Sequence, residues 1–147
     1  MASTTFTGPV TSRNGFVGAT TGALNGTLGA TTPASASVTT FSQNGARTLT
    51  AQTLAATGST QGGAAAITGS VVIVTVTAST QGVKLPTAAA GARVEVFASR
   101  TVGNKVYPFS GDVISGAATN ASITLASNKG AIFQAVDAVT WRYIKGA

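Results

Sequence analysis

The sequence contains no cysteine and no histidine, and only nine basic and three acidic side chains among its 147 residues. These absences exclude thiol nucleophiles, histidine general bases, Ser-His-Asp triads and the usual zinc sites. The three acids, Glu95, Asp112 and Asp137, can form at most one carboxylate pair, which is too few for a cage around a hard cation. The sequence therefore predicts a protein that is not an enzyme and that carries no metal and no cofactor.

Long apolar runs and glycine-rich phosphate-binding motifs are also missing. The longest strongly apolar run, residues 71–76, is far shorter than the roughly 20 residues that span a bilayer. The nine basic residues are spread singly, although a nucleic-acid-binding face needs several of them together. We therefore expect no membrane and no direct nucleic-acid partner. The dilute net charge of +6 suits docking on a broadly acidic protein instead.

Small residues dominate what is present, and their distribution divides the chain near residue 67. The sequence has 27 Ala, 25 Thr and 18 Gly. Residues 1–67 contain two charged side chains, Arg13 and Arg47, and few larger apolar ones, whereas residues 68–147 contain the other ten charges and most of the larger apolar residues. We interpret residues 1–67 as an extended Gly/Thr/Ala-rich N-terminal arm and residues 68–147 as a β domain.

A weak internal similarity runs through the arm. Residues 11–16 and 41–47 share the pattern Ser-x-Asn-Gly, and residues 25–26 add a third Asn-Gly. This pair favours type I′ turns, so the arm either makes short β excursions joined by tight turns or is extended with incidental turns. Because such a segment buries little apolar surface, it should become ordered only against a partner.

The second part of the chain reads as a series of short strands. Residues 71–77 are apolar on both faces, which is typical of a central or sandwiched strand. Alternation places Val94 and Val96 toward the core, and it places Trp141 and Tyr143 together on one side of the last strand. The spacing predicts an all-β fold, a short-stranded antiparallel sandwich or barrel. The expected strands are residues 71–77, 83–86, 93–98, 105–109, 112–114, 122–125, 131–136 and 139–144.

Several stretches resemble structural proteins of tailed bacteriophages. Residues 6–18, Phe-Thr-Gly-Pro-Val-Thr-Ser-Arg-Asn-Gly-Phe-Val-Gly, followed by Thr/Gly/Ala repeats, resemble the N-terminus of many small proteins of this class. Residues 82–97, 106–116 and 125–131, together with Trp141, resemble the β-rich modules of head-decoration proteins and fibres. The resemblance implies a virion protein, often trimeric, with an extended arm and an antiparallel β domain.

The function implied is that of a capsid decoration (cement) protein, which binds the outer surface of an icosahedral phage head and bridges capsid subunits. Its partners would be the major capsid protein and two further copies in a homotrimer, on the capsid exterior of a virion assembled in the host cytoplasm. Two alternatives stay open: a tail or head fibre component, and a virion carbohydrate-binding module that stacks sugars on Trp141, Tyr143 or Tyr107. The candidate assembly-interface residues all lie in the arm: Phe6, Arg13, Phe16, Phe41 and Arg47.

Overall fold

The computed structural model describes residues 44–46, 48–99 and 101–146, and all of their regular structure is β. They belong to one compact unit, Gln43–Ala147. The division drawn from composition at residue 67 lies inside this unit, because two strands and the core residue Ile67 come before residue 68. The strands are β1 (Ala51–Ala55), β2 (Ala65–Ala66), β3 (Val71–Thr75), β4 (Gly82–Lys84), β5 (Arg93–Phe97), β6 (Asn104–Tyr107), β7 (Val113–Ile114), β8 (Ile123–Leu125), β9 (Gly130–Ala135) and β10 (Thr140–Lys145).

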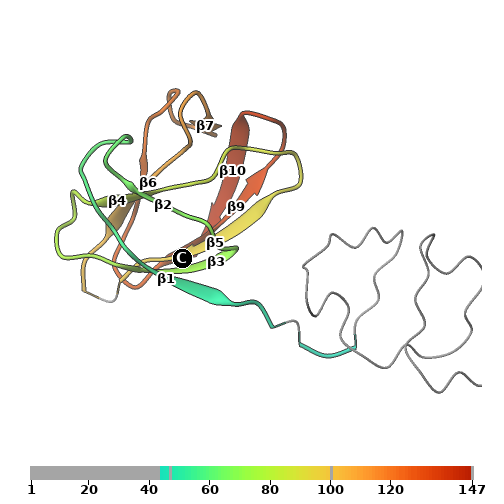
Figure 1. The fold of residues 1–147 in the computed structure, drawn as a ribbon, viewed down its shortest axis with the longest axis horizontal. Helices are drawn as coiled ribbons and strands as arrows, with labels where there is room; N and C mark the ends of the chain where they lie inside the picture. The colour runs from blue at the N-terminus through green and yellow to red at the C-terminus, as the bar shows by residue number, and fades with distance from the viewer. Residues whose placement is uncertain (1–43, 47, 100, 147) are drawn as a thin grey trace, which may run out of the picture. The chain divides into compact units, whose positions relative to one another are not determined.

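The strands form two sheets (Figure 1). The six-stranded sheet has the order β1-β3-β5-β9-β10-β7, and the four-stranded sheet has the order β2-β4-β6-β8. From β1 to β6 the chain alternates between the sheets, so that each coil of the chain contributes one strand to each sheet.

This coiling makes the first strands of each sheet parallel. β1 pairs with β3 and β3 with β5 in parallel, as do β2 with β4 and β4 with β6. Parallel neighbours need a long crossover, and here the strand in the opposite sheet lies within that crossover. The all-β prediction is confirmed, but the predicted antiparallel sandwich or barrel is wrong: the arrangement resembles a β-solenoid.

The antiparallel strand pairs involve the C-terminal strands, and one isolated antiparallel bridge joins Thr57 to Gly82. β9 pairs antiparallel with β5 and β10, and β8 pairs antiparallel with β6. Asn128, in the turn before β9, has a positive φ of 59°, a conformation that asparagine tolerates. These strands therefore complete the sheets on the side opposite β1 and β2.

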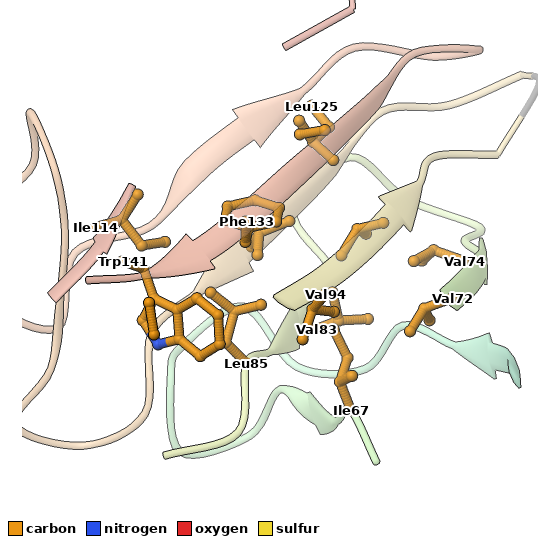
Figure 2. Close-up of a cluster of buried hydrophobic side chains, with 14 of the residues drawn as sticks. Ile67, Val72, Val74, Val83, Leu85, Val94, Ile114, Leu125, Phe133 and Trp141 are labelled. Carbon is orange, nitrogen blue, oxygen red and sulfur yellow. The ribbon is translucent and has the colours of Figure 1, made fainter. Parts of the chain in front are cut away.

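The core lies between the two sheets and is built by alternation along each strand. Val72 of β3 lies opposite Val96 of β5, and both side chains are fully buried. Phe133 and Trp141 from β9 and β10 supply the largest buried side chains, and Val83 and Leu125 face them from the four-stranded sheet (Figure 2). Like side chains on successive coils thus stack into apolar ladders.

Glutamine side chains form hydrogen bonds with the turns that connect the two sheets. Gln52 Oε1 accepts hydrogen bonds from the backbone N–H groups of Thr68 (3.1 Å) and Gly69 (2.9 Å) at the corner before β3. Gln81 Oε1 does the same for Thr77 and Ala78 before β4. These bonds satisfy turn donors that no strand ladder reaches.

Asp112 ties the segment after β4 to the turn before β7, and its replacement should destabilise the unit. The residue is 3% exposed, and its Oδ2 accepts the buried N–H of Ala88 at 2.8 Å. We expect Asp112→Ala to cost about 1–3 kcal/mol in free energy of unfolding, because the Ala88 donor loses its partner. Urea denaturation checks this. Asp112→Asn keeps an acceptor and should recover part of the loss, and equal losses for the two variants would contradict the explanation.

Candidate assembly surface

The five residues predicted as assembly contacts, Phe6, Arg13, Phe16, Phe41 and Arg47, lie outside the described residues. The described part of the chain presents a different apolar surface. It is the outer face of the six-stranded sheet, the side turned away from the core, together with Leu49 just before β1. We call this surface the apolar face and define it by Leu49, Val71, Ile73, Phe97, Ile132 and Ile144.

Strand register brings these side chains together. Ile73 of β3 lies opposite Phe97 of β5, and Ile132 of β9 lies opposite Ile144 of β10. Ile73 is 46% exposed, Phe97 44% and Ile144 74%. Each alternates along its strand with buried core residues, so the sheet is apolar on both sides.

Shallow hollows join these residues into one surface. Leu49 and Val71 line the first hollow, Ile73 and Phe97 line the second, and Ile132 with Ile144 lines two more. The sequence did carry a signal for this face: residues 71–77 are apolar at inward and outward positions alike. That signal was interpreted as a strand covered on both sides, whereas the outer side is exposed in the structure.

The Phe97 ring has a defined place on this face. It lies across Gly130 of β9, the residue opposite it in the register. A Cβ atom on Gly130 would lie 2.8 Å from Cδ1 of the ring, which is too close for any real side chain. Because Gly130 has no side chain, the Phe97 ring can pack directly against its backbone, as in other pairs where an aromatic side chain covers a strand glycine.

Charged groups are sparse on the apolar face. Arg93 and Glu95 of β5 form an ion pair, with Arg93 Nη2 3.0 Å from Glu95 Oε1. Arg142 lies beside Gln134 near the Ile132–Ile144 pair, and Lys145 ends β10. Because the guanidinium of Arg93 is about half exposed, we assign its ion pair little weight in stability. The face therefore combines apolar side chains with one ion pair, in which Glu95 lies between Val71 and Ile132, and with basic residues at the β10 border.

The free edge of β1 adjoins this face. Among the described residues no strand pairs with the side of β1 opposite β3. Its sequence, Ala-Gln-Thr-Leu-Ala, has neither a charge nor a proline, the features that usually protect an edge from pairing with another chain. This edge can accept a further strand through main-chain hydrogen bonds.

The three acidic residues each serve a separate local role. Glu95 forms an ion pair with Arg93. Asp112 is buried and accepts a hydrogen bond from the N–H of Ala88, and Asp137 lies in the turn between β9 and β10. Within residues 44–46, 48–99 and 101–146, no group of three or more His, Cys, Asp or Glu residues is placed to hold a metal ion.

Asp137 gives the β9–β10 turn a pH dependence. The N–H groups of Val139 (2.8 Å) and Thr140 (2.6 Å) donate to its Oδ1, and the Val139 bond is the main cause that holds the pKa of Asp137 below its ordinary value of 3.8. Because this pKa is lowered by folding, the stabilisation is present above pH 3.8 and is lost as the pH falls through the folded-state pKa.

We therefore expect the Asp137 carboxyl to titrate below 3.8 in an NMR pH titration, with the amide shifts of Val139 and Thr140 following it. Asp137→Asn should remove this titration from both amides. A carboxyl that titrates at or above 3.8, or amide shifts that follow another group, would rule out this role for Asp137.

The aromatic rings considered for sugar stacking are mostly inside the unit. Trp141 is fully buried, and Tyr107 is 6% exposed with its hydroxyl donating to Ser59 O at 2.6 Å. Tyr143 is half-buried and stacks on Phe133, with ring centroids 5.8 Å apart. Trp141 belongs to the core, and neither Trp141 nor Tyr107 has a free face for a sugar.

The apolar face and the β1 edge are therefore two surfaces of the described unit that are suited to assembly with another chain. No helix in the described part of the chain has the length and apolar character that crossing a bilayer requires.

Comparison of the chain with models of known families, with curated proteins and with solved structures gave no match.

Proposed function

We propose that this chain is a non-enzymatic virion structural protein, a capsid decoration (cement) protein that binds the outer surface of an icosahedral phage head and bridges capsid subunits. The observation that carries this proposal is the apolar face beside the uncharged edge of β1. A monomeric soluble protein rarely leaves a large apolar patch uncovered, whereas an assembly component uses one.

Composition supports the same proposal. Twelve charged side chains among 147 residues is a low share for a protein that stays alone in solution. Residues 6–18 and 82–97 add the resemblance to phage structural proteins. The proposed partners are the major capsid protein and two further copies of this chain, on the exterior of the capsid.

The proposed location and role are tested by counting copies. Quantitative mass spectrometry of purified virions from the phage that encodes this chain should give on the order of hundreds of copies per particle, because each local symmetry position of the shell can be occupied. Cryo-electron microscopy of the same particles should then place the density on the outer capsid surface. Absence of the chain from the virions would refute the proposal.

One structural observation favours a second candidate, a tail or head fibre component. The parallel coils of β1 to β6 end at an edge without a protecting charge, and coils of this type can be continued by strands from the same or another chain. The copy number distinguishes the two candidates. A fibre component should be present in at most on the order of a few tens of copies per virion, whereas a decoration protein should be present in hundreds.

A further inference from the structure

We propose that the pair of residues Asn44 and Gly45 is a site of spontaneous covalent modification, at which Asn44 loses its side-chain amide and gains a carboxylate. The reaction needs no enzyme, and water is its only co-reactant. The inference goes beyond the proposed function and does not depend on it, because the reaction is followed on free protein.

The reaction begins when the backbone nitrogen of Gly45 attacks Cγ of Asn44. A carbon–nitrogen bond forms and closes a cyclic imide, the bond to the side-chain nitrogen breaks, and ammonia leaves with the proton of the Gly45 N–H. Water then opens the imide: attack at Cγ gives aspartate, and attack at the main-chain carbon gives isoaspartate. Either product lowers the formal net charge of the chain by one from +6, and no oxidation or reduction takes place.

The attacking nitrogen of Gly45 is open. Among the described residues, no hydrogen bond joins the Gly45 N–H to an acceptor. Residue 45 has no side chain to shield its nitrogen, and nothing lies within 4 Å of the position that a Cβ atom would take. Asn44 and Gly45 are both exposed and lie outside the strands. The Asn44 side chain and water can therefore both reach this nitrogen.

The corresponding nitrogen is engaged at the three other asparagines of the described residues, Asn104, Asn120 and Asn128. In each case the N–H of the following residue donates to a backbone carbonyl. The bonds are Lys105 to Gln81 O (3.0 Å), Ala121 to Ala118 O (3.0 Å) and Lys129 to Ala126 O (3.3 Å). Attack by any of these nitrogens first has to break its hydrogen bond, so these asparagines are protected by the fold.

The side chain of Asn120 is held as well. Its Oδ1 accepts hydrogen bonds from Gln61 Nε2 (2.9 Å) and from the Gly111 N–H (2.8 Å). Cyclisation would require this side chain to leave both partners. The Asn44 side chain has no hydrogen bond to another described residue, so it can turn toward Gly45 without such a loss.

The site lies where the N-terminal residues join the compact unit. Asn44 is the second residue of the unit Gln43–Ala147 and precedes β1, and the buried core cluster contains no residue before Ala56. Isoaspartate adds one carbon atom to the backbone at this point. The products should therefore leave the unit folded while they change the charge and the backbone path at the junction.

The test incubates the full-length chain in mildly alkaline buffer and follows each asparagine by peptide mapping and mass spectrometry. Asn44 should lose its amide at least about tenfold faster than Asn120 or Asn128, because an engaged N–H and a side chain on the following residue both slow the attack. Methylation by an isoaspartyl methyltransferase distinguishes isoaspartate from aspartate. Peptides containing Asn14 and Asn25 are scored separately, since these residues lie outside the described ones.

Hydroxylamine gives a second readout, because it attacks the cyclic imide and cleaves the chain between residues 44 and 45. The fragment that begins at Gly45 should accumulate from the native wild type. It should not form from Asn44→Gln, whose longer side chain has to close a larger ring. Asn25→Gln is the matched control: it alters another Asn-Gly pair and should leave cleavage after Asn44 unchanged.

Unfolding in urea separates the effect of the sequence from that of the fold. The rate at Asn44 should change little, whereas the rates at Asn120 and Asn128 should rise as their protecting hydrogen bonds are lost. Two results would overturn the proposal. One is an Asn44 that keeps its amide in the native chain and loses it only in urea, and the other is a native rate at Asn44 no higher than that at Asn120.

Discussion

Replacing Trp141 by alanine is expected to lower the free energy of unfolding by about 3–5 kcal/mol, the largest single effect in the unit. The indole is fully buried, and Trp141 lies opposite Ile114 in the pairing of β10 with β7. Deleting it leaves a cavity at the point where the last strands close the core. Because a domain of this size is stable by only about 5–15 kcal/mol, the variant should be partly unfolded at moderate urea concentrations.

Trp141→Phe separates the contribution of volume from that of hydrogen bonding. The indole Nε1 is buried and has no hydrogen-bond partner among the described residues. The phenylalanine variant therefore loses packing but no hydrogen bond, and it should cost clearly less than alanine.

These variants are compared by urea unfolding followed by far-ultraviolet circular dichroism, since Trp141 is the single tryptophan and its fluorescence disappears with it. Val139→Ala, at a side chain 51% exposed, serves as the control and should stay within about 0.5 kcal/mol of the wild type. A loss below about 1 kcal/mol for Trp141→Ala would contradict the central place given to the indole.

Under the proposed function, deleting residues 2–40 is expected to abolish binding to undecorated capsids. The deletion removes Phe6, Arg13 and Phe16, three of the five predicted contact residues, and leaves the compact unit Gln43–Ala147 intact. Each main-chain hydrogen bond to a partner contributes only about 0.5–1.5 kcal/mol, so many contacts along the segment have to act together. Their joint loss should reduce occupancy to background.

Occupancy is measured by mixing the deletion variant with undecorated heads, sedimenting the heads and quantifying the bound chain. Circular dichroism and the oligomer mass of the free variant show whether the unit and its self-association survive. Val139→Lys in the full-length chain is a control that should bind normally. Occupancy equal to that of the wild type would place the capsid-binding surface on the unit itself and would refute the role given to the N-terminal residues.

Strand positions could be predicted from the sequence because alternation and turn residues are local signals. The strands expected at residues 93–98, 131–136 and 139–144 correspond to β5, β9 and β10, with Val94 and Val96 buried as predicted. β1 and β2 escaped detection because Ala51–Ala55 and Ala65–Ala66 are short and weakly apolar, and because most of their stability comes from pairing with β3 and β4.

Strand direction could not be predicted from the same signals. Regular spacing of short strands is compatible with hairpins in one sheet and with coils that alternate between two sheets. The difference depends on the connections, and here Gln52 and Gln81 hold corners that carry the chain across to the other sheet. The five predicted interface residues lie outside the described residues. The exposure of the outer side of β3 could not be predicted, because alternation alone does not show which side of a strand is covered.

The position of β1 at the end of its sheet has a mechanical consequence. A tension applied through the N-terminal residues reaches the coil of β1 and β2 first, and these two strands pair only with β3 and β4. Beyond that pairing, side-chain hydrogen bonds join Ser59 to Tyr107 and Gln61 to Pro108 and Asn120. In an array of stacked units each one is held by its nearest neighbours, so the outermost coil yields before the Trp141 core. Residues 51–70, once drawn out, would span at most about 66–72 Å while the remaining coils stay folded. Under tension the first coil would thus extend and limit the force that reaches the remaining coils of the unit.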